Sequence, residues 1–348
     1  MIRFFRLHTL ILVLIILLAG KEDDNTHRRD TNEDTFINPL LTSGPDPWVE
    51  QKDDWYYVTH TTGKNLRLYR TKKMSDLRHA ESKTIWIPPS TGMNSKQIWA
   101  PEIHYLRGKW YFYYAADDGL NENHRMWVLE NSSEDPFTGT WLDKGELKLP
   151  DDKWAIDGTV FEHDGELYFL WSGWESDANV RQDIYITRLK DPWTAEGERV
   201  LLSKPEHDWE TRGGTPKINE APQFMAKGDK LFIIYSASGC WTDDYSLGLL
   251  SADSTANPLA PASWTKHSEP VFEKNAEGQA FGPGHNGFFT SPDGTEDWII
   301  YHANPESGQG CGGNRSPRMQ QFTWSTTGFP DLGEPAKLGV SLARPSGE

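Results

Sequence analysis

The stretch Glu102-Ile-His-Tyr-Leu-Arg-Gly-Lys-Trp-Tyr-Phe-Tyr-Tyr114 has the pattern of two short strands joined by an Arg-Gly turn. A polar residue opens it and aromatic residues fill its second half, which is typical of a buried β-hairpin. The same pattern recurs four more times, and each copy has its own Gly- or Asp-containing turn. The other copies are residues 46–58, 157–171, 220–235 and 285–301, and successive copies start 55 to 65 residues apart.

A repeat of this length holds about four short strands, which is the size of one β-propeller blade. No segment of residues 46–345 sustains the apolar spacing of a helix. Five copies therefore predict an all-β fold, namely a five-bladed β-propeller.

The first residues of the five copies are four acids and one histidine. In a propeller the innermost strand of every blade lines the central channel, so equivalent positions converge near one axis. Burying like charges together is costly unless they are paired, bound to a metal or used in chemistry. We therefore expect a functional site that contains Asp46, Glu102, Asp157, Glu220 and His285.

The composition narrows the class of ligand. The 348 residues include 35 Lys and Arg against 51 Asp and Glu, a formal net charge of −16, which argues against nucleic acid as a partner. The 16 Trp, 12 Tyr and 15 Phe exclude disorder for most of the chain and supply flat apolar surfaces. Among them, Trp110, Trp171 and Trp298 lie in the hairpins of the repeat and are expected to pack between blades.

Converging carboxylates favour acid/base catalysis on an uncharged substrate, because the chain has no Ser/His/Asp spacing, phosphate loop or Cys nucleophile pattern. Glycoside hydrolysis needs one protonated acid and one ionised carboxylate, and a third carboxylate nearby raises the pKa of the acid. Aromatic rings are suitable stacking surfaces for sugars.

The first 35 residues differ from the rest of the chain. Residues 1–20 have the pattern of an export signal, because Arg3 and Arg6 precede an apolar run that is too short for a comfortable membrane span. The end of this run resembles a bacterial lipoprotein box, but Lys21 stands where that box needs Cys; an uncleaved anchor is the alternative. Residues 21–35 predict a disordered tether, which leaves 36–348 as the propeller, the catalytic domain. The chain is expected to be exported: secreted, periplasmic or held at the cell surface.

Cys240 and Cys311 are the two cysteines of the chain. Their number and spacing fit no metal motif. In an exported protein they form a disulfide or remain as two buried thiols, and the sequence leaves both alternatives open.

Five motifs, one in each copy of the repeat, carry a family resemblance: Asn38-Pro-Leu…Pro45-Asp46-Pro-Trp48, Trp99-Ala-Pro-Glu102-Ile, Ile156-Asp157-Gly158, Asn219-Glu220-Ala-Pro222 and Gly282-Pro-Gly-His285-Asn. In this order they resemble glycoside hydrolase family 43 over roughly residues 37–345. Members of that family are five-bladed propellers that act with inversion on arabinose- and xylose-containing polysaccharides.

The resemblance implies three catalytic roles. Asp46 would be the general base that activates water, Glu220 the general acid, and Asp157 the carboxylate that tunes the pKa of the acid and orients it. His285 matches an axial histidine that, in many members, faces a bound calcium ion through water or sits near a halide; the alternative is a hydrogen-bonded channel residue without metal. The chemistry requires no cofactor, and a structural Ca²⁺ on the propeller axis is the one metal implied.

Four further residues are implied to contact or support the substrate. Glu102 matches a supporting position. Arg315 matches an arginine that contacts a sugar hydroxyl or a catalytic carboxylate, with Arg318 as its rival because spacing alone separates them. Trp99 is expected to form a stacking wall for the terminal sugar and Trp154 is a similar candidate, with packing between blades as the alternative for both.

Residues 238–249, 281–285 and 298–303 resemble arabinofuranosidases of this family, which release single L-arabinofuranose units from arabinan or arabino-oligosaccharides. We therefore expect an inverting exo-α-L-arabinofuranosidase that acts as a monomer on arabinan, arabino-oligosaccharides or arabinoxylan. Endo-α-1,5-arabinanase and β-xylosidase are the alternatives within the family. A non-catalytic sugar-binding propeller is the alternative from another class.

Overall fold

The computed structural model describes residues 34–348. The predicted export signal (1–20) and most of the predicted tether (21–35) lie outside the described residues. The tether prediction is wrong at its end, because Thr35 is already the first residue of strand β1 (Thr35–Ile37). Within residues 34–348 no helix has both the length and the apolar character needed to cross a membrane.

The strands form five four-stranded antiparallel units, which we call blades 1 to 5 in chain order. Blade 1 consists of β2 (Trp48–Lys52), β3 (Trp55–Thr59), β4 (Leu66–Thr71) and β5 (Glu81–Trp86). Blade 2 consists of β6 (Lys96–Leu106), β7 (Lys109–Asp117), β8 (Arg125–Asn131) and β9 (Leu142–Glu146). Blade 3 consists of β10 (Ala155–His163), β11 (Glu166–Trp174), β12 (Arg181–Asp191) and β13 (Thr194–Ser203).

Blade 4 consists of β14 (Lys217–Lys227), β15 (Lys230–Ala237), β16 (Ser246–Asp253) and β17 (Thr265–Lys266). Blade 5 consists of β18 (Phe281–Thr290), β19 (Asp297–Asn304), β20 (Ser316–Trp324) and β21 (Pro330–Asp331). The helical turns of the described chain are four short 3₁₀ helices: η1 (Met74–His79), η2 (Asn121–Asn123), η3 (Asp208–Thr211) and η4 (Pro261–Ser263).

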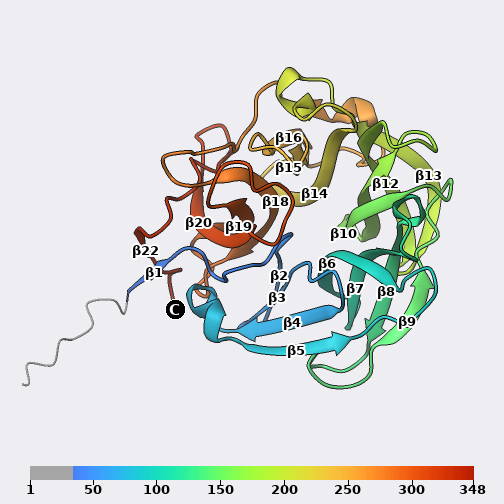
Figure 1. The fold of residues 1–348 in the computed structure, drawn as a ribbon, viewed down its shortest axis with the longest axis horizontal. Helices are drawn as coiled ribbons and strands as arrows, with labels where there is room; N and C mark the ends of the chain where they lie inside the picture. The colour runs from blue at the N-terminus through green and yellow to red at the C-terminus, as the bar shows by residue number, and fades with distance from the viewer. Residues whose placement is uncertain (1–33) are drawn as a thin grey trace, which may run out of the picture. The chain divides into compact units, whose positions relative to one another are not determined.

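The blades surround a central axis, with the first strand of each blade innermost (Figure 1). The innermost strands contact one another in the order β2, β6, β10, β14, β18 and back to β2. Blades 3 and 4 are also joined by a short parallel pairing between β12 and β14. The five-bladed β-propeller predicted from the repeat is therefore confirmed.

The turns of the repeat explain its hairpins. Arg107 and Gly108 connect β6 to β7, and both have positive φ values of 47° and 84°. Asp164 and Gly165 connect β10 to β11 with φ values of 51° and 79°. Two consecutive residues with positive φ form the turn that matches the right-handed twist of paired strands.

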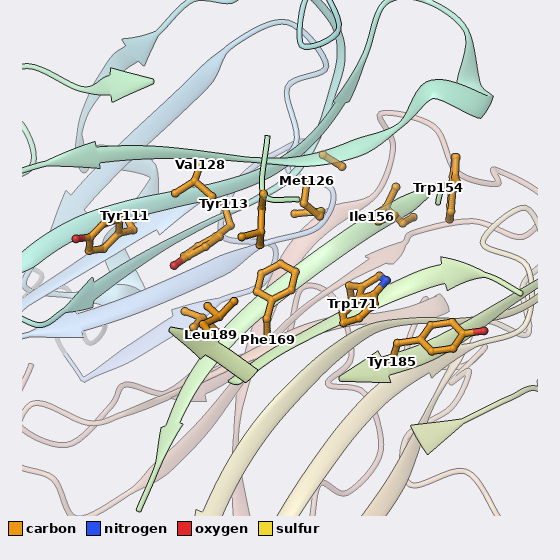
Figure 2. Packing of buried hydrophobic residues seen from close by; sticks show 14 of the residues in the cluster. Tyr111, Tyr113, Met126, Val128, Trp154, Ile156, Phe169, Trp171, Tyr185 and Leu189 are labelled. Carbon is orange, nitrogen blue, oxygen red and sulfur yellow. The ribbon is translucent and has the colours of Figure 1, made fainter. Parts of the chain in front are cut away.

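A hydrophobic cluster fills each of the five junctions between neighbouring blades. Figure 2 shows the cluster between blades 2 and 3, where the rings of Tyr113 and Phe169 have centroids 5.6 Å apart. Trp110, Trp171 and Trp298 are at most 2 % exposed and belong to these clusters. Their predicted packing role is confirmed.

The N-terminal segment of the described chain forms hydrogen bonds with blade 5. Strand β1 pairs antiparallel with β22 (Ser341–Ala343). The Asn38 side chain donates to the Met319 carbonyl oxygen (2.9 Å) and accepts from the Met319 N–H (3.0 Å). These bonds connect the segment before blade 1 to the last blade.

Candidate active site

Four of the five inner strands carry a register irregularity near the predicted site. One extra residue is inserted relative to the neighbouring strand in β10 and in β14, and two are inserted, at separate points, in β6 and in β18. A positive φ marks the same position in each blade: Asp46 (56°), Ala100 (41°), Asp157 (55°), Ala221 (50°) and His285 (49°). Residues other than glycine rarely adopt this conformation, and such outliers gather at functional sites.

This register corrects the predicted equivalence of the five opening residues. Asp46, Asp157 and His285 do occupy equivalent positions. Glu220, however, stands one residue before the position with positive φ, and Glu102 stands two residues after it. The five side chains therefore do not form a single ring around the axis.

A cavity of about 370 Å³ opens here, and all five blades contribute to its lining. Seven of the eight residues named from the sequence line it: Asp46, Trp99, Trp154, Asp157, Glu220, His285 and Arg315. The lining residues that sequence reasoning did not name as site residues are Thr61, Asn121, Ile156, Asn179, Gln182, Pro216, Ile218, Cys240, Trp241 and Cys311.

Asp46 is surrounded by basic side chains. Its Oδ1 lies 2.7 Å from Arg315 Nη1, 3.3 Å from His285 Nδ1 and 3.4 Å from His302 Nδ1. Burial opposes ionisation, but the Arg315 guanidinium and the two imidazoles hold the pKa of Asp46 well below its usual range. Asp46 is therefore ionised at neutral pH and can accept a proton.

The structure separates the two candidate arginines. Arg315 lies on the loop between β19 and β20, lines the cavity and pairs with Asp46. Arg318 is fully buried in β20, donates from Nη2 to the Ala303 carbonyl oxygen (3.4 Å) and does not line this cavity. The geometry thus favours Arg315.

The pKa values of Glu220 and Asp157 are raised, in contrast to the lowered pKa of Asp46. Burial raises the pKa of Glu220 to about 7, although the Tyr245 hydroxyl, which donates to Glu220 Oε1 (2.8 Å), partly counteracts this. Burial and the charges of Glu220 and Asp46 also raise the pKa of Asp157, whose Oδ2 accepts the Ala221 N–H (3.1 Å). The Asp157–Glu220 pair therefore retains a proton at neutral pH, so the cavity holds both a proton donor and a proton acceptor.

His285 lies between the carboxylates. Its Nδ1 is 3.3 Å from Asp46 Oδ1 and 4.0 Å from Asp157 Oδ2, and its backbone N–H donates to Ser236 Oγ (2.9 Å). Burial lowers the pKa of His285, which favours the neutral ring. Among residues 34–348 no group of three or more His, Cys, Asp or Glu side chains could hold a metal ion.

Glu102 is the one predicted site residue that does not line the cavity. Its Oε1 accepts from Gln223 Nε2 (2.5 Å) and its Oε2 lies 2.9 Å from His104 Nε2. Glu50 lies close enough to be influenced by the charges of Glu102 and His104, and burial raises the pKa of Glu50 to about 7. Glu102 therefore belongs to a second buried polar group, in which its carboxylate is already paired, and its supporting role stays a prediction.

The two candidate tryptophans are held by stacking. Trp99 stacks on His124 with ring centroids 4.0 Å apart and an interplanar angle of 24°. Trp154 stacks on Trp174 at 5.0 Å and 13°. Each ring therefore has one face occupied by a neighbouring ring while part of it reaches the cavity.

Cys240 and Cys311 form a disulfide, which resolves the alternative left open by the sequence. It joins the loop after β15 to the loop after β19 and lines the cavity. Because Arg315 lies on the second of these loops, the disulfide fixes the segment that carries the partner of Asp46.

Sequence reasoning also missed two partners of the carboxylates. The backbone N–H of Asp46 donates to His302 Nδ1 (3.1 Å), and Tyr245 bonds Glu220. Neither belongs to an inner strand, so the repeat did not single them out. Both do lie in the segments 238–249 and 298–303 that resemble arabinofuranosidases, and that was the available signal.

The comparisons with known proteins agree with this geometry. The family model of glycosyl hydrolases family 43 matches residues 36–330. The extracellular exo-α-(1→5)-L-arabinofuranosidase of Streptomyces avermitilis is 36% identical over 97% of this chain and 72% of its own length. The enzyme of the same name from Streptomyces chartreusis is 38% identical over 77% of this chain and 82% of its own length.

Among solved structures, the α-L-arabinofuranosidase from Lactobacillus brevis superposes with a TM-score of 0.82 at 34% identity. The match covers 88% of this chain and 98% of that one. The family model spans most of the described residues, and the five motifs fall one in each blade. The chain therefore belongs to glycosyl hydrolases family 43.

Proposed function

We propose that this chain is an inverting exo-α-L-arabinofuranosidase that releases terminal L-arabinofuranose from arabinan or arabino-oligosaccharides. The observation that carries the proposal is the contrast between two carboxyls in one cavity. Arg315 keeps Asp46 ionised, whereas burial raises the pKa of Glu220 to about 7. Hydrolysis with inversion needs this combination of a base and an acid.

In the proposed reaction Asp46 takes a proton from a water molecule that attacks the anomeric carbon. Glu220 gives its proton to the departing glycosidic oxygen as the bond to the anomeric carbon breaks. Asp157 shares the proton that the Asp157–Glu220 pair retains, and its Oδ2 accepts the Ala221 N–H, which orients the peptide next to Glu220. Arg315 and His285 position Asp46.

The names of the relatives support the choice of sugar. Both Streptomyces relatives are named exo-α-(1→5)-L-arabinofuranosidases, and proteins named arabinan endo-1,5-α-L-arabinosidase are only 22% to 24% identical. Those Streptomyces proteins are also named extracellular, which supports export of this chain. A non-catalytic sugar-binding role is disfavoured because the cavity retains Asp46, Asp157 and Glu220.

The calcium ion and the monomeric state stay predictions. Calcium requires six to eight oxygen ligands, and His285 offers a nitrogen that faces Asp46 and Asp157. The described residues therefore do not fit direct coordination of calcium at this position, and we assign the metal no part in the reaction.

The products formed from linear arabinan test the proposal. We expect arabinose to be the only early product, because an exo-acting enzyme removes one terminal sugar at a time. A ladder of oligosaccharides would assign endo-arabinanase activity instead. Faster cleavage of p-nitrophenyl β-D-xylopyranoside than of the α-L-arabinofuranoside would assign xylosidase activity, and binding without cleavage would assign a sugar-binding protein.

The pH profile tests the assignment of the acid. Because Glu220 must be protonated and its pKa is about 7, kcat/KM is expected to fall as pH rises through about 7. Tyr245→Phe removes a hydrogen bond that stabilises the ionised carboxylate, so it should raise the pKa of Glu220 and move this limb to higher pH. The Phe ring preserves the stacking against His302 (5.8 Å, 9°). A limb that stays in place or moves to lower pH would contradict the role of Glu220.

A further inference from the structure

Three neighbouring side chains of blade 3 each carry a buried polar atom that has no hydrogen-bond partner within residues 34–348. These atoms are Trp154 Nε1, Trp174 Nε1 and Gln182 Oε1, on side chains that are 4%, 5% and 7% exposed. Buried polar atoms are nearly always paired, and leaving one unpaired costs about 1–3 kcal/mol. Three such atoms together indicate that something else supplies their partners.

The three residues form one row across the blade, which we call the blade 3 row. Trp174 pairs directly with Gln182 between β11 and β12. On the other side, the Trp174 N–H donates to the Trp154 carbonyl oxygen (3.4 Å) and the two indole rings are stacked. Two members of the row, Trp154 and Gln182, line the cavity that holds Asp46, Asp157 and Glu220. Figure 2 shows Trp154 beside Ile156, at one end of the cluster between blades 2 and 3.

The row lies on the side of the proposed acid. Gln182 pairs with Ile218 of β14, which is two residues before Glu220. The proposed base, Asp46, belongs to blade 1, and the inner strand of blade 1 contacts those of blades 2 and 5. Blades 3 and 4 are therefore the two blades opposite the base.

This position decides which part of the substrate the row can meet. In an inverting hydrolysis the acid protonates the departing oxygen, and the water held by the base attacks from the opposite face of the sugar. Groups beside the acid and away from the base therefore face the sugar that departs. Trp174 occupies one face of the Trp154 ring, and the Trp154 ring N–H has no partner among residues 34–348.

We propose that Gln182 and Trp154 hydrogen-bond to hydroxyl groups of the leaving-group sugar, and that Trp174 holds Trp154 in position. The inference rests on the proposed function and names a binding site within it. The ligand class is a glycosidically linked pentose on the leaving side of the scissile bond. An aryl leaving group has no such hydroxyls and does not use this site.

Gln182→Leu tests the proposal on two substrates that share the arabinofuranosyl group and differ in what departs. On α-1,5-linked arabinobiose we expect kcat/KM to fall about tenfold, the effect of one lost hydrogen bond. On p-nitrophenyl α-L-arabinofuranoside the change should stay within about twofold. Because Gln182 Oε1 has no partner in the free protein, the melting temperature should be unchanged or higher.

Thr187→Val is the matched control. Thr187 lies on the same strand, is fully buried and has an unpartnered Oγ1, but it does not line the cavity. This variant should leave the rates on both substrates unchanged.

Each other outcome overturns the inference. An equal loss on both substrates would place Gln182 against the arabinofuranosyl group that is released, and no loss on either would remove it from substrate binding. A lower melting temperature with parallel losses would make its role structural. If the parent protein cleaves neither substrate, the proposed function itself fails, whatever Gln182→Leu does.

Discussion

Glu220→Gln is expected to lower kcat on arabinobiose by about 10³-fold, because the amide keeps the shape of the side chain but has no proton to give to the departing oxygen. The loss should be much smaller on a dinitrophenyl arabinofuranoside, whose leaving group departs without protonation. The alkaline limb of the pH profile should also disappear, since that limb reports the pKa of about 7 at Glu220. Steady-state kinetics on the two substrates across pH measure both effects.

Glu50→Gln is the control for this variant. Burial raises the pKa of Glu50 to about 7 as well, but Glu50 does not line the cavity. Gln can still accept the hydrogen bond from the Tyr105 N–H (3.2 Å). The control should keep the parental rates and the alkaline limb. If Glu50→Gln loses the limb and Glu220→Gln keeps it, the acid has been misassigned.

Asp46→Asn is expected to lower kcat by about 10³- to 10⁴-fold, and by the same factor on both substrates. Activation of water is needed whatever group departs, so a better leaving group should not restore the rate. The negative charge of Asp46 contributes to the raised pKa of Glu220. Without that charge, the residual activity should begin to fall at a lower pH than the activity of the parent protein. A loss confined to arabinobiose would contradict the role of Asp46 as the base.

The fold was predictable because each blade repeats a strong local signal. Turns such as Arg107-Gly108 and aromatic strands recur at nearly constant spacing, and hairpins are determined mainly by such short-range features. The register of the inner strands was not predictable in the same way. A bulge adds one residue without changing the apolar pattern of the strand. Aligning the five copies on their acidic residues therefore assigned Glu102 and Glu220 to positions that are not equivalent to that of Asp46.

The identities of the three carboxylates in the cavity followed from the motifs, but their surroundings did not. His302 and Tyr245 lie on or next to second and third strands, and their contacts with Asp46 and Glu220 depend on how the blades pack. Gln182 comes from a third strand and carries no motif. The disulfide joins residues 71 positions apart in the chain, and spacing in the sequence alone does not predict whether two cysteines so far apart will pair.

The configuration of the first sugar released tests the central claim most directly. Proton NMR spectra recorded during the first turnovers on arabinobiose identify the anomer before the two forms equilibrate. An inverting reaction through Asp46 and Glu220 predicts that β-L-arabinofuranose appears first from the α-linked substrate. Initial release of the α-anomer would mean retention, and would contradict the assignment of Asp46 as the base that activates water.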